Sequence, residues 1–503
     1  MGILVQSLRT ITDQSRALLL KVRYFLIAFT CIGLGILFSV MIDSPESGEF
    51  VVSIVVVLAL LFIIVNKPLN GLLVWLFFMV FIESWVKIPM GAGIPDLSFS
   101  RFAIVFLAIF MLAQAAIGKF RFVKPGWVEV FLVLTIIGIM SAAPRSIAPP
   151  PTGVIQSAIA LWATPLIGYF FAKNLIQSKE DLHKILWAVA LLGFVSGVYA
   201  GYEHATGNVL FLKKGVEVTR LYRGGESGIR LIEGLMGSTG NMGRALAVTI
   251  PVTFYLFLEH RKSDLTKIFL IAMIVAQFYG IIVAMSRTPW YALLIALFLM
   301  QIFYPQFRKV FLAIVFAAAI GLVATWDQVS QSQVANRVND DNSTLEGREA
   351  RWASATAMWR RKPIYGWGYG WYERDSGKFR TDGGRTSFEA IESDFLNVLV
   401  SAGLVGLVPY ILFITAIIVN AMRLFFKARA PDWPGFVKSE TIVVCGAVLA
   451  VLLICSYTQV NTQPVIKLIV FSVAGATVGS HEYLLRRKIE NVNTPTRLRP
   501  NMM

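Results

Sequence analysis

Long apolar runs recur along the chain and alternate with short polar segments that are rich in basic residues. Each run has roughly 18 to 22 residues, enough for a helix to cross about 30 Å of hydrocarbon. The runs are apolar on all faces, so lipid or neighbouring spans must cover them. The pattern predicts an all-α polytopic transmembrane bundle of about 14 spans. The spans are expected near residues 24–42, 50–65, 71–88, 100–117, 127–143, 154–172, 185–202, 242–258, 267–285, 289–304, 309–326, 394–421, 440–458 and 465–484.

The basic residues predict the orientation of these spans. Residues 1–23 carry four of them, and the clusters at 119–124, 261–267, 423–429 and 486–488 fall on the same side. By the positive-inside rule this side is cytoplasmic and holds both termini. We therefore expect a cytoplasmic segment 1–23, for which an interfacial helix is one interpretation, a transmembrane domain 24–485 and a cytoplasmic basic tail 486–503. The asymmetry accounts for most of the net charge of +16, so no nucleic-acid partner is needed; the lipid bilayer is the partner.

Cysteine and histidine are too sparse to predict a disulfide or a metal site. Cys31, Cys445 and Cys455 all fall in predicted spans, where packing explains them. The four histidines form no pair with ligand spacing. We expect no metal and no cofactor.

Two long polar segments are predicted on the outer face, at 203–241 and 327–393. The second is far longer than an ordinary connection and interrupts an otherwise apolar chain. Because catalytic side chains concentrate on loops held by a rigid scaffold, this segment is the expected place of an active site.

The second loop is expected to be partly helical. Ser343 and Glu346 have the spacing of a capping box, an apolar stripe runs from Trp352 to Trp359, and Pro363 should end the helix. Arg348 and Arg351, one turn apart, would flank one edge of that helix.

Glycines and aromatic residues alternate from Gly366 to Trp371. Small residues permit sharp turns, while aromatic faces stack on sugars, so Trp367 and Tyr369 are candidate sugar contacts. An aromatic belt at the membrane interface is the alternative interpretation.

Two arginines sit at the outer edge of predicted spans. Arg287 lies at the turn between the spans 267–285 and 289–304, and Arg244 lies just inside the span from 242. An arginine at such a position is a functional candidate, with snorkelling at a helix end as the alternative. Together with Arg223 and Arg230 of the first loop and the two loop-two arginines, they would suit a diphosphate, which guanidinium groups bind bidentately. Lys467, near the outer end of the last span, is a further candidate.

The order of these features resembles the O-antigen polymerase and O-antigen ligase superfamily of bacterial envelope glycan enzymes. The resemblance rests on Ser286-Arg287, on Trp352, on Pro363-Ile364-Tyr365-Gly366-Trp367-Gly368, on Leu396 and on Gly403-Leu404-Val405-Gly406. The family has a His-Asn pair before the leucine; here Glu392 and Ser393 stand at those positions.

The resemblance implies a glycosyltransferase of the bacterial inner membrane with a periplasmic active site. The donor would be an undecaprenyl-diphosphate-linked oligosaccharide, and the acceptor a hydroxyl on a second glycan. Arg287 and the other arginines would stabilise the diphosphate leaving group. Glu392 is the candidate base, and Asp394 the second choice.

Because the ligase-like histidine is replaced, we favour a polymerase of O-antigen or exopolysaccharide repeat units, with a chain-length regulator and a flippase as expected partners. A ligase that transfers the glycan to lipid A-core or protein stays open. A flippase or secondary transporter and a structural scaffold are the alternatives from other classes; the chain lacks the repeated, Gly/Pro-broken spans typical of transporters.

Overall fold

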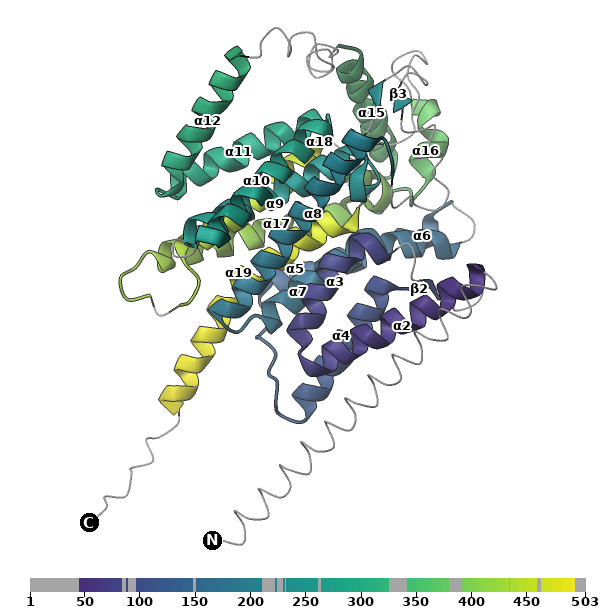
Figure 1. Ribbon diagram of the computed structural model, residues 1–503. Helices are drawn as coiled ribbons and strands as arrows, with labels where there is room; N and C mark the ends of the chain where they lie inside the picture. Colours follow the sequence, from purple (N-terminus) through teal and green to yellow (C-terminus); the bar gives the residue numbers. More distant parts are fainter. Residues whose placement is uncertain are drawn as a thin grey trace, which may run out of the picture. The chain divides into compact units, whose positions relative to one another are not determined.

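The computed structural model describes residues 45–83, 87–88, 96–147, 151–209, 222–223, 229–230, 232–260, 264–324, 342–379, 391–433, 435–458 and 463–493. The chain divides into two compact units, residues 1–120 and 121–503 (Figure 1). We describe each unit by itself.

The first unit is a small helical group. It contains α2 (Pro45–Asn66), α3 (Pro68–Ile82), the antiparallel strands β1 (Lys87–Ile88) and β2 (Leu97–Ser98), and α4 (Phe99–Ala116). The Glu83 carboxylate accepts hydrogen bonds from the backbone N–H of Ser100 (2.9 Å) and from its hydroxyl (2.6 Å), which ties the end of α3 to the start of α4. The span predicted at 71–88 is therefore too long: the helix ends at Ile82, and residues 87–88 form a strand instead.

The second unit holds the remaining described elements. They are α5 (Trp127–Met140), η1 (Ala143–Arg145), α6 (Pro151–Ala158), η2 (Ile159–Ala163), α7 (Thr164–Leu175), α8 (Lys179–Thr206), β3 (Tyr222–Arg223), β4 (Ile229–Arg230), η4 (Gly234–Met236), α9 (Thr239–Glu259), α10 (Asp264–Val283), α11 (Arg287–Phe303), α12 (Phe307–Ala324), α15 (Asn342–Arg361), α16 (Trp371–Asp375), η5 (Ser376–Phe379), α17 (Asp394–Ala428), α18 (Ser439–Thr458) and α19 (Pro464–Asn493).

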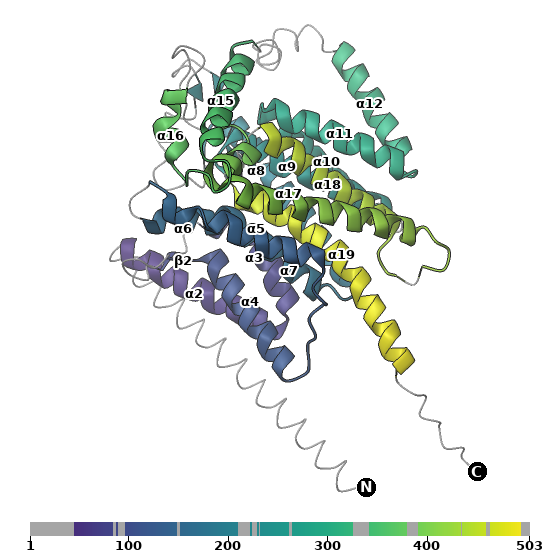
Figure 2. The ribbon, with the colours of Figure 1, turned by 180° about the vertical axis from the view of Figure 1, so that it is seen from behind.

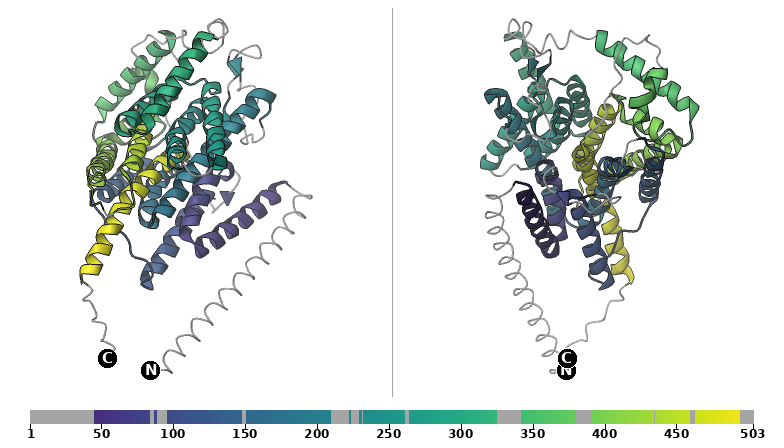
Figure 3. Two further views of the ribbon diagram at one scale, coloured as in Figure 1. Left: turned by 60° about the vertical axis from the view of Figure 1, so that its left-hand side comes forward. Right: turned by 90° about the vertical axis from the view of Figure 1, so that its right-hand side faces the viewer.

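Small residues let the long helices of this unit approach closely. Along α19, which is yellow in Figure 3, Gly475 and Gly479 face the backbone of α7, where an added Cβ would overlap the carbonyls of Tyr169 and Lys173. This is the Gly-x-x-x-Gly spacing by which membrane helices pack. Gly138 brings α5 against α17 in the same way, and the two helices run side by side in Figure 2. Close backbone contacts thus determine how α19 packs on α7 and how α5 packs on α17.

Among the described residues, eight helices are long and apolar enough to cross a membrane. They are Phe99–Ala116, Trp127–Arg145, Gly153–Leu175, Lys179–Thr206, Thr239–Glu259, Asp264–Val283, Asp394–Ala428 and Ser439–Thr458. Shorter apolar helices, at Val55–Asn66, Pro68–Ile82, Arg287–Phe303 and Pro464–Gly479, add to them. The prediction of an all-α, multi-pass membrane protein is confirmed. The span predicted at 24–42 lies outside the described residues, and each of the others overlaps at least one helix.

Candidate active site

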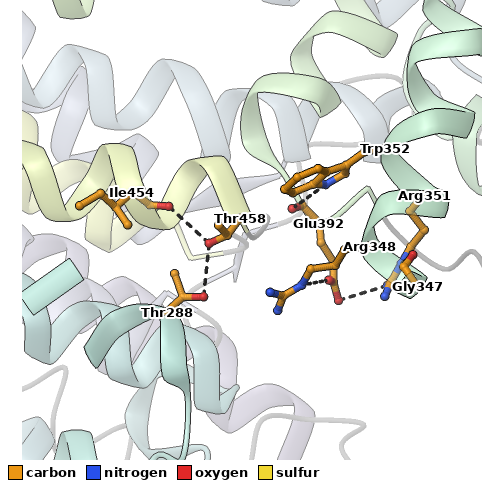
Figure 4. A network of polar contacts seen from close by, with 8 residues as sticks. All are labelled: Thr288, Gly347, Arg348, Arg351, Trp352, Glu392, Ile454 and Thr458. Atoms are coloured by element: carbon orange, nitrogen blue, oxygen red, sulfur yellow. Dashed lines mark hydrogen bonds and ion pairs between the residues drawn. The ribbon is translucent and has the colours of Figure 1, made fainter. Parts of the chain in front are cut away.

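Glu392 is held between two arginines of α15 (Figure 4). Its Oε2 lies 2.8 Å from Nε of Arg348, and its Oε1 lies 3.1 Å from Nη1 of Arg351. The two arginines are three residues apart, so one face of α15 presents both to the carboxylate. The Trp352 indole donates to the backbone carbonyl of Glu392 at 3.4 Å. Both carboxylate oxygens are thus engaged in one ion pair each, and each oxygen keeps a second lone pair that can accept a proton.

A chain of contacts joins this group to the start of α11. The Trp352 ring lies 5.4 Å from the Tyr457 ring, centroid to centroid, at the end of α18. The next residue, Thr458, donates its hydroxyl to Thr288 at 3.3 Å (Figure 4). Thr288 follows Arg287, the first residue of α11. The structure therefore brings the start of α11 close to Glu392, although more than 100 residues separate them in sequence.

Arg244 lies on the first turns of α9, behind Arg287. Ser238 caps this helix by accepting from the Asn241 N–H at 3.2 Å. Gly243 lies so close to Pro289 of α11 that an added Cβ would be 2.9 Å from the proline ring. The Arg244 side chain is buried and interacts electrostatically with Asp394. The first turns of α9 and α11, each carrying an arginine, therefore meet; helix N-termini also favour anions through their free N–H groups.

Asp394 is buried beneath this surface in a polar cluster. Its Oδ2 lies 3.2 Å from Nζ of Lys467, which is in the first turn of α19. The same oxygen accepts a hydrogen bond from the Ser456 hydroxyl at 3.0 Å. The Lys467 ammonium also lies 3.4 Å from the centroid of the Trp162 ring. The cluster joins α17, α18, α19 and the π-turn η2. Trp162 and Ser456 were not predicted from the sequence, because their distance along the chain hides this convergence.

The glycine-rich motif of loop two is fastened to a break in α17. Gly403 has a left-handed conformation (φ 66°) inside that helix. Around it, the N–H groups of Leu404 and Val405 donate to the carbonyls of Pro363 and Ile364, at 2.9 and 3.1 Å. In return, Trp367 N donates to Val400 O, and Gly368 N to Ser401 O, both at 2.8 Å. The two sequence motifs, 363–368 and 403–406, therefore form one backbone ladder.

Trp367 and Tyr369, the predicted sugar contacts, use their polar atoms within the protein. The Trp367 indole donates to Met358 O at 2.8 Å, and the Tyr369 hydroxyl donates to Ile139 O at 3.2 Å. Burial raises the pKa of the Tyr369 hydroxyl above its ordinary value, so it stays a donor. Trp367 packs on the small core of the loop, whose buried members are Ala355, Met358, Tyr372, Ile391 and Val400.

The first outer loop is described only in part. Arg223 and Arg230 lie in β3 and β4, which pair with Tyr222 opposite Arg230 and Arg223 opposite Ile229. Their side chains lie outside the described residues, as do those of Ser343 and Glu346. The helix that Ser343 and Glu346 were expected to cap is α15, which begins at Asn342 and ends at Arg361, two residues before Pro363.

Within the described part of the chain, no group of three or more His, Cys, Asp or Glu side chains could hold a metal ion. The positive charges of the described residues around the site are the guanidinium groups of Arg244, Arg287, Arg348 and Arg351, whereas the Lys467 ammonium is buried and paired with Asp394. This composition fits a diphosphate, whose oxygens such groups bind.

Residues 269–411 match the family model described as O-antigen ligase. The matched segment contains Arg287, the whole of α15, Glu392 and the ladder around Gly403. No curated protein matches the chain. The resemblance to the O-antigen polymerase and ligase superfamily, predicted from motifs within these residues, is confirmed.

Proposed function

Starting from the similarity of residues 269–411 to the O-antigen ligases, we propose that this membrane protein polymerises polyprenyl-diphosphate-linked oligosaccharide repeat units into O-antigen or exopolysaccharide. The match by itself implies a membrane enzyme of the ligase or polymerase type that transfers a glycan. The observation that carries this proposal is the pairing of Arg348 and Arg351 with Glu392, a group that a chain of contacts joins to the start of α11, which carries Arg287.

In the proposed reaction, a hydroxyl oxygen of the acceptor glycan attacks the anomeric carbon of the donor. The bond between that carbon and the diphosphate oxygen breaks, and polyprenyl diphosphate leaves. Arg287 and Arg244 stabilise the charge that develops on the leaving group. Glu392 takes the proton of the hydroxyl. The reaction needs no nucleotide sugar, and we propose that it needs no metal.

The ion pairs of Glu392 link the freedom of this side chain to donor binding. A diphosphate is a stronger partner for guanidinium groups than one carboxylate, because it offers more oxygens and more charge. Donor binding would therefore draw Arg348 or Arg351 away from Glu392 and release an oxygen of that carboxylate. With the donor in place, the Glu392 side chain would be freer to turn toward the acceptor hydroxyl.

We place the site on the periplasmic face of the inner membrane, with both termini cytoplasmic, from the distribution of basic residues along the chain. A chain-length regulator and a flippase are the proposed partners. The polymerase is preferred over the ligase because Glu392 stands where the ligases have histidine.

The test is to supply the purified protein with lipid-diphosphate repeat units, with and without lipid A-core, and no nucleotide sugar. The proposal expects glycans of two or more repeats on one lipid. Transfer of the glycan to lipid A-core, and not to a second repeat unit, would make the protein a ligase, the function that the name of the family model favours. Movement of the lipid across a vesicle membrane with no new glycosidic bond would overturn both.

A further inference from the structure

An apolar groove of about 380 Å³ lies between α11, α17 and α18, toward the ends of these helices that are remote from Glu392. It is lined on α11 by Leu299 and Phe303, on α17 by Ile418, Ala421, Met422, Phe425 and Phe426, and on α18 by Ile442, Val443, Gly446, Ala447, Leu449, Ala450 and Leu453. Both α11 and α17 pack against α18, which forms the floor (Figure 2).

The floor is hollow because α18 carries small residues there. Gly446 is exposed although its neighbours along the helix are buried, and an added Cβ would meet no heavy atom within 4 Å. Ala447 and Ala450 continue this strip. A chain of methylene groups could lie along such a floor in contact with carbon atoms on three sides.

An arginine closes one end of the groove. Arg429 follows Ile418, Met422 and Phe425 at helical spacing, so it extends the same face of α17. Its Nη2 donates to the carbonyl of Phe303 at 3.3 Å, and its guanidinium lies 4.2 Å from the centroid of the Phe425 ring. Since the Phe303 and Phe425 rings are themselves 5.9 Å apart, Arg429 spans the two walls at their ends.

A second arginine lies at the same end of α11. Arg308 donates to the carbonyls of Gln301 and Ile302, at 3.0 and 3.1 Å. The groove therefore ends at two cationic groups whose positions are fixed by backbone carbonyls. An apolar channel with guanidinium groups at its rim is complementary to an acyl chain that carries a phosphate.

We propose that this groove binds one acyl chain of an anionic glycerophospholipid, whose headgroup phosphate contacts Arg429. An uncharged or zwitterionic lipid would fill the groove with the same chain but gain less from the arginines. The site is distinct from the glycan-transfer site and does not depend on the proposed function.

The role of the Arg429 charge is tested by native mass spectrometry of the full-length protein. The protein is titrated with phosphatidylglycerol or with phosphatidylcholine that has the same acyl chains. The wild type should bind phosphatidylglycerol more tightly. Arg429→Gln should weaken that binding about fivefold, as expected for one basic residue at an anionic surface, and should weaken phosphatidylcholine binding less, so that the preference between the two lipids narrows. Lys427→Gln is the matched control, because two residues along the helix place it about 200° away. Equal binding of the two lipids by the wild type, or an unchanged preference in Arg429→Gln, overturns the proposal.

The groove itself is tested by Gly446→Leu, which fills the floor. The number of retained phosphatidylglycerol molecules should fall by one. Gly153→Leu, on the exposed face of α6 with equally open space around it, should leave the number unchanged. Retention of the same number by Gly446→Leu overturns the proposal. So does displacement of the lipid from this site by polyprenyl phosphate at lower concentration than by phosphatidylglycerol, which would assign the groove to the tail of the donor.

Discussion

Asp394 and Lys467 form an ion pair that joins the start of α17 to the start of α19, with each side chain only 1% exposed. Glu392 lies two residues before Asp394, so the position of the candidate base depends on where this pair anchors α17. The pair is a structural support placed directly beneath the proposed reaction.

The first prediction concerns this pair. Asp394→Asn leaves a buried ammonium group without its carboxylate and should destabilise the fold by about 3 to 5 kcal/mol. The double variant Asp394→Asn, Lys467→Met removes both charges and keeps a thioether that can contact the Trp162 ring, so most of the stability should return. Unfolding in detergent measures both variants.

The same double variant separates support from chemistry. If Asp394 only anchors α17, the folded double variant should retain glycan transfer. A stable but inactive double variant would instead give the Asp394–Lys467 pair a role in the reaction itself.

The second prediction concerns Glu392. Glu392→Gln keeps the shape but removes the proton acceptor and both ion pairs, and should slow polymerisation by about 10² to 10⁴-fold. Glu392→Asp should be much less impaired. Because the ion pairs are partly exposed, stability should change by about 1 kcal/mol or less, so a large loss of rate cannot be attributed to unfolding. Normal polymer from the glutamine variant would remove Glu392 from the mechanism.

The third prediction concerns Arg287. Arg287→Ala should lower the rate about 10² to 10³-fold, the usual loss when one group that stabilises developing charge is removed. The protein should still insert in the membrane. Arg360→Ala, on the exposed end of α15, serves as the control. Unchanged polymer length and rate in the Arg287 variant would contradict its role at the diphosphate.

The fourth prediction concerns the glycines of the backbone ladder. Gly366→Ala combines a left-handed φ of 67° with a direct clash against Ser401 and Gly403. Gly370→Ala has φ 81° but open space around it. Each should lose about 1 to 2 kcal/mol from the backbone conformation, and only Gly366→Ala should lose more. Protease cleavage between α15 and α17 reports whether the loop has detached; equal sensitivity of the two variants would contradict the ladder.

The fifth prediction concerns acid. Lys378 and Arg374 hold the pKa of Asp375 below its ordinary value, at N–O distances of 3.0 and 3.3 Å. Since the folded pKa is the lower one, the ion pairs stabilise this turn at neutral pH, and the stabilisation disappears as the pH falls through the folded pKa. The protection factors of the amides of residues 376–379, which correct for the intrinsic pH dependence of hydrogen exchange, should therefore fall in acid. In Asp375→Asn the protection factors should lack this pH dependence.

The sequence was sufficient to predict the helices, but not to predict which of their side chains lie together at the site. Apolar runs identify spans because lipid demands a closed backbone hydrogen-bond pattern, and the helix of loop two followed from its stripe and Pro363. The mutual attachment of 363–368 and 403–406 is made of backbone bonds, which leave no side-chain pattern beyond glycine. The ion pairs of Glu392 join residues more than 40 positions apart in sequence. The spacing of residues along the chain does not predict which carboxylate will pair with Arg348 and Arg351.

The aromatic residues show the same limit from the other side. Alternation of Gly and Trp or Tyr predicted sugar contacts, which stays a prediction; the polar atoms of Trp367 and Tyr369 bond to backbone carbonyls, so a sugar contact would use a ring face. Tertiary packing decides which face of an aromatic side chain is available, and for Tyr369 that packing involves Ile139, which is remote in sequence.

The backbone attachment around Gly403 holds Ile364 and Tyr365 by their carbonyl groups. Ile364 and Tyr365 belong to the attached segment, yet they are 55% and 59% exposed. Their carbonyls are bonded, to Val405 and to Arg145 respectively, while their side chains project from the attachment. Substitutions at Ile364 should therefore change the surface of the loop without changing how the loop is held, whereas substitutions at Tyr365 also remove the contact of its ring with the Arg145 guanidinium, at 5.6 Å.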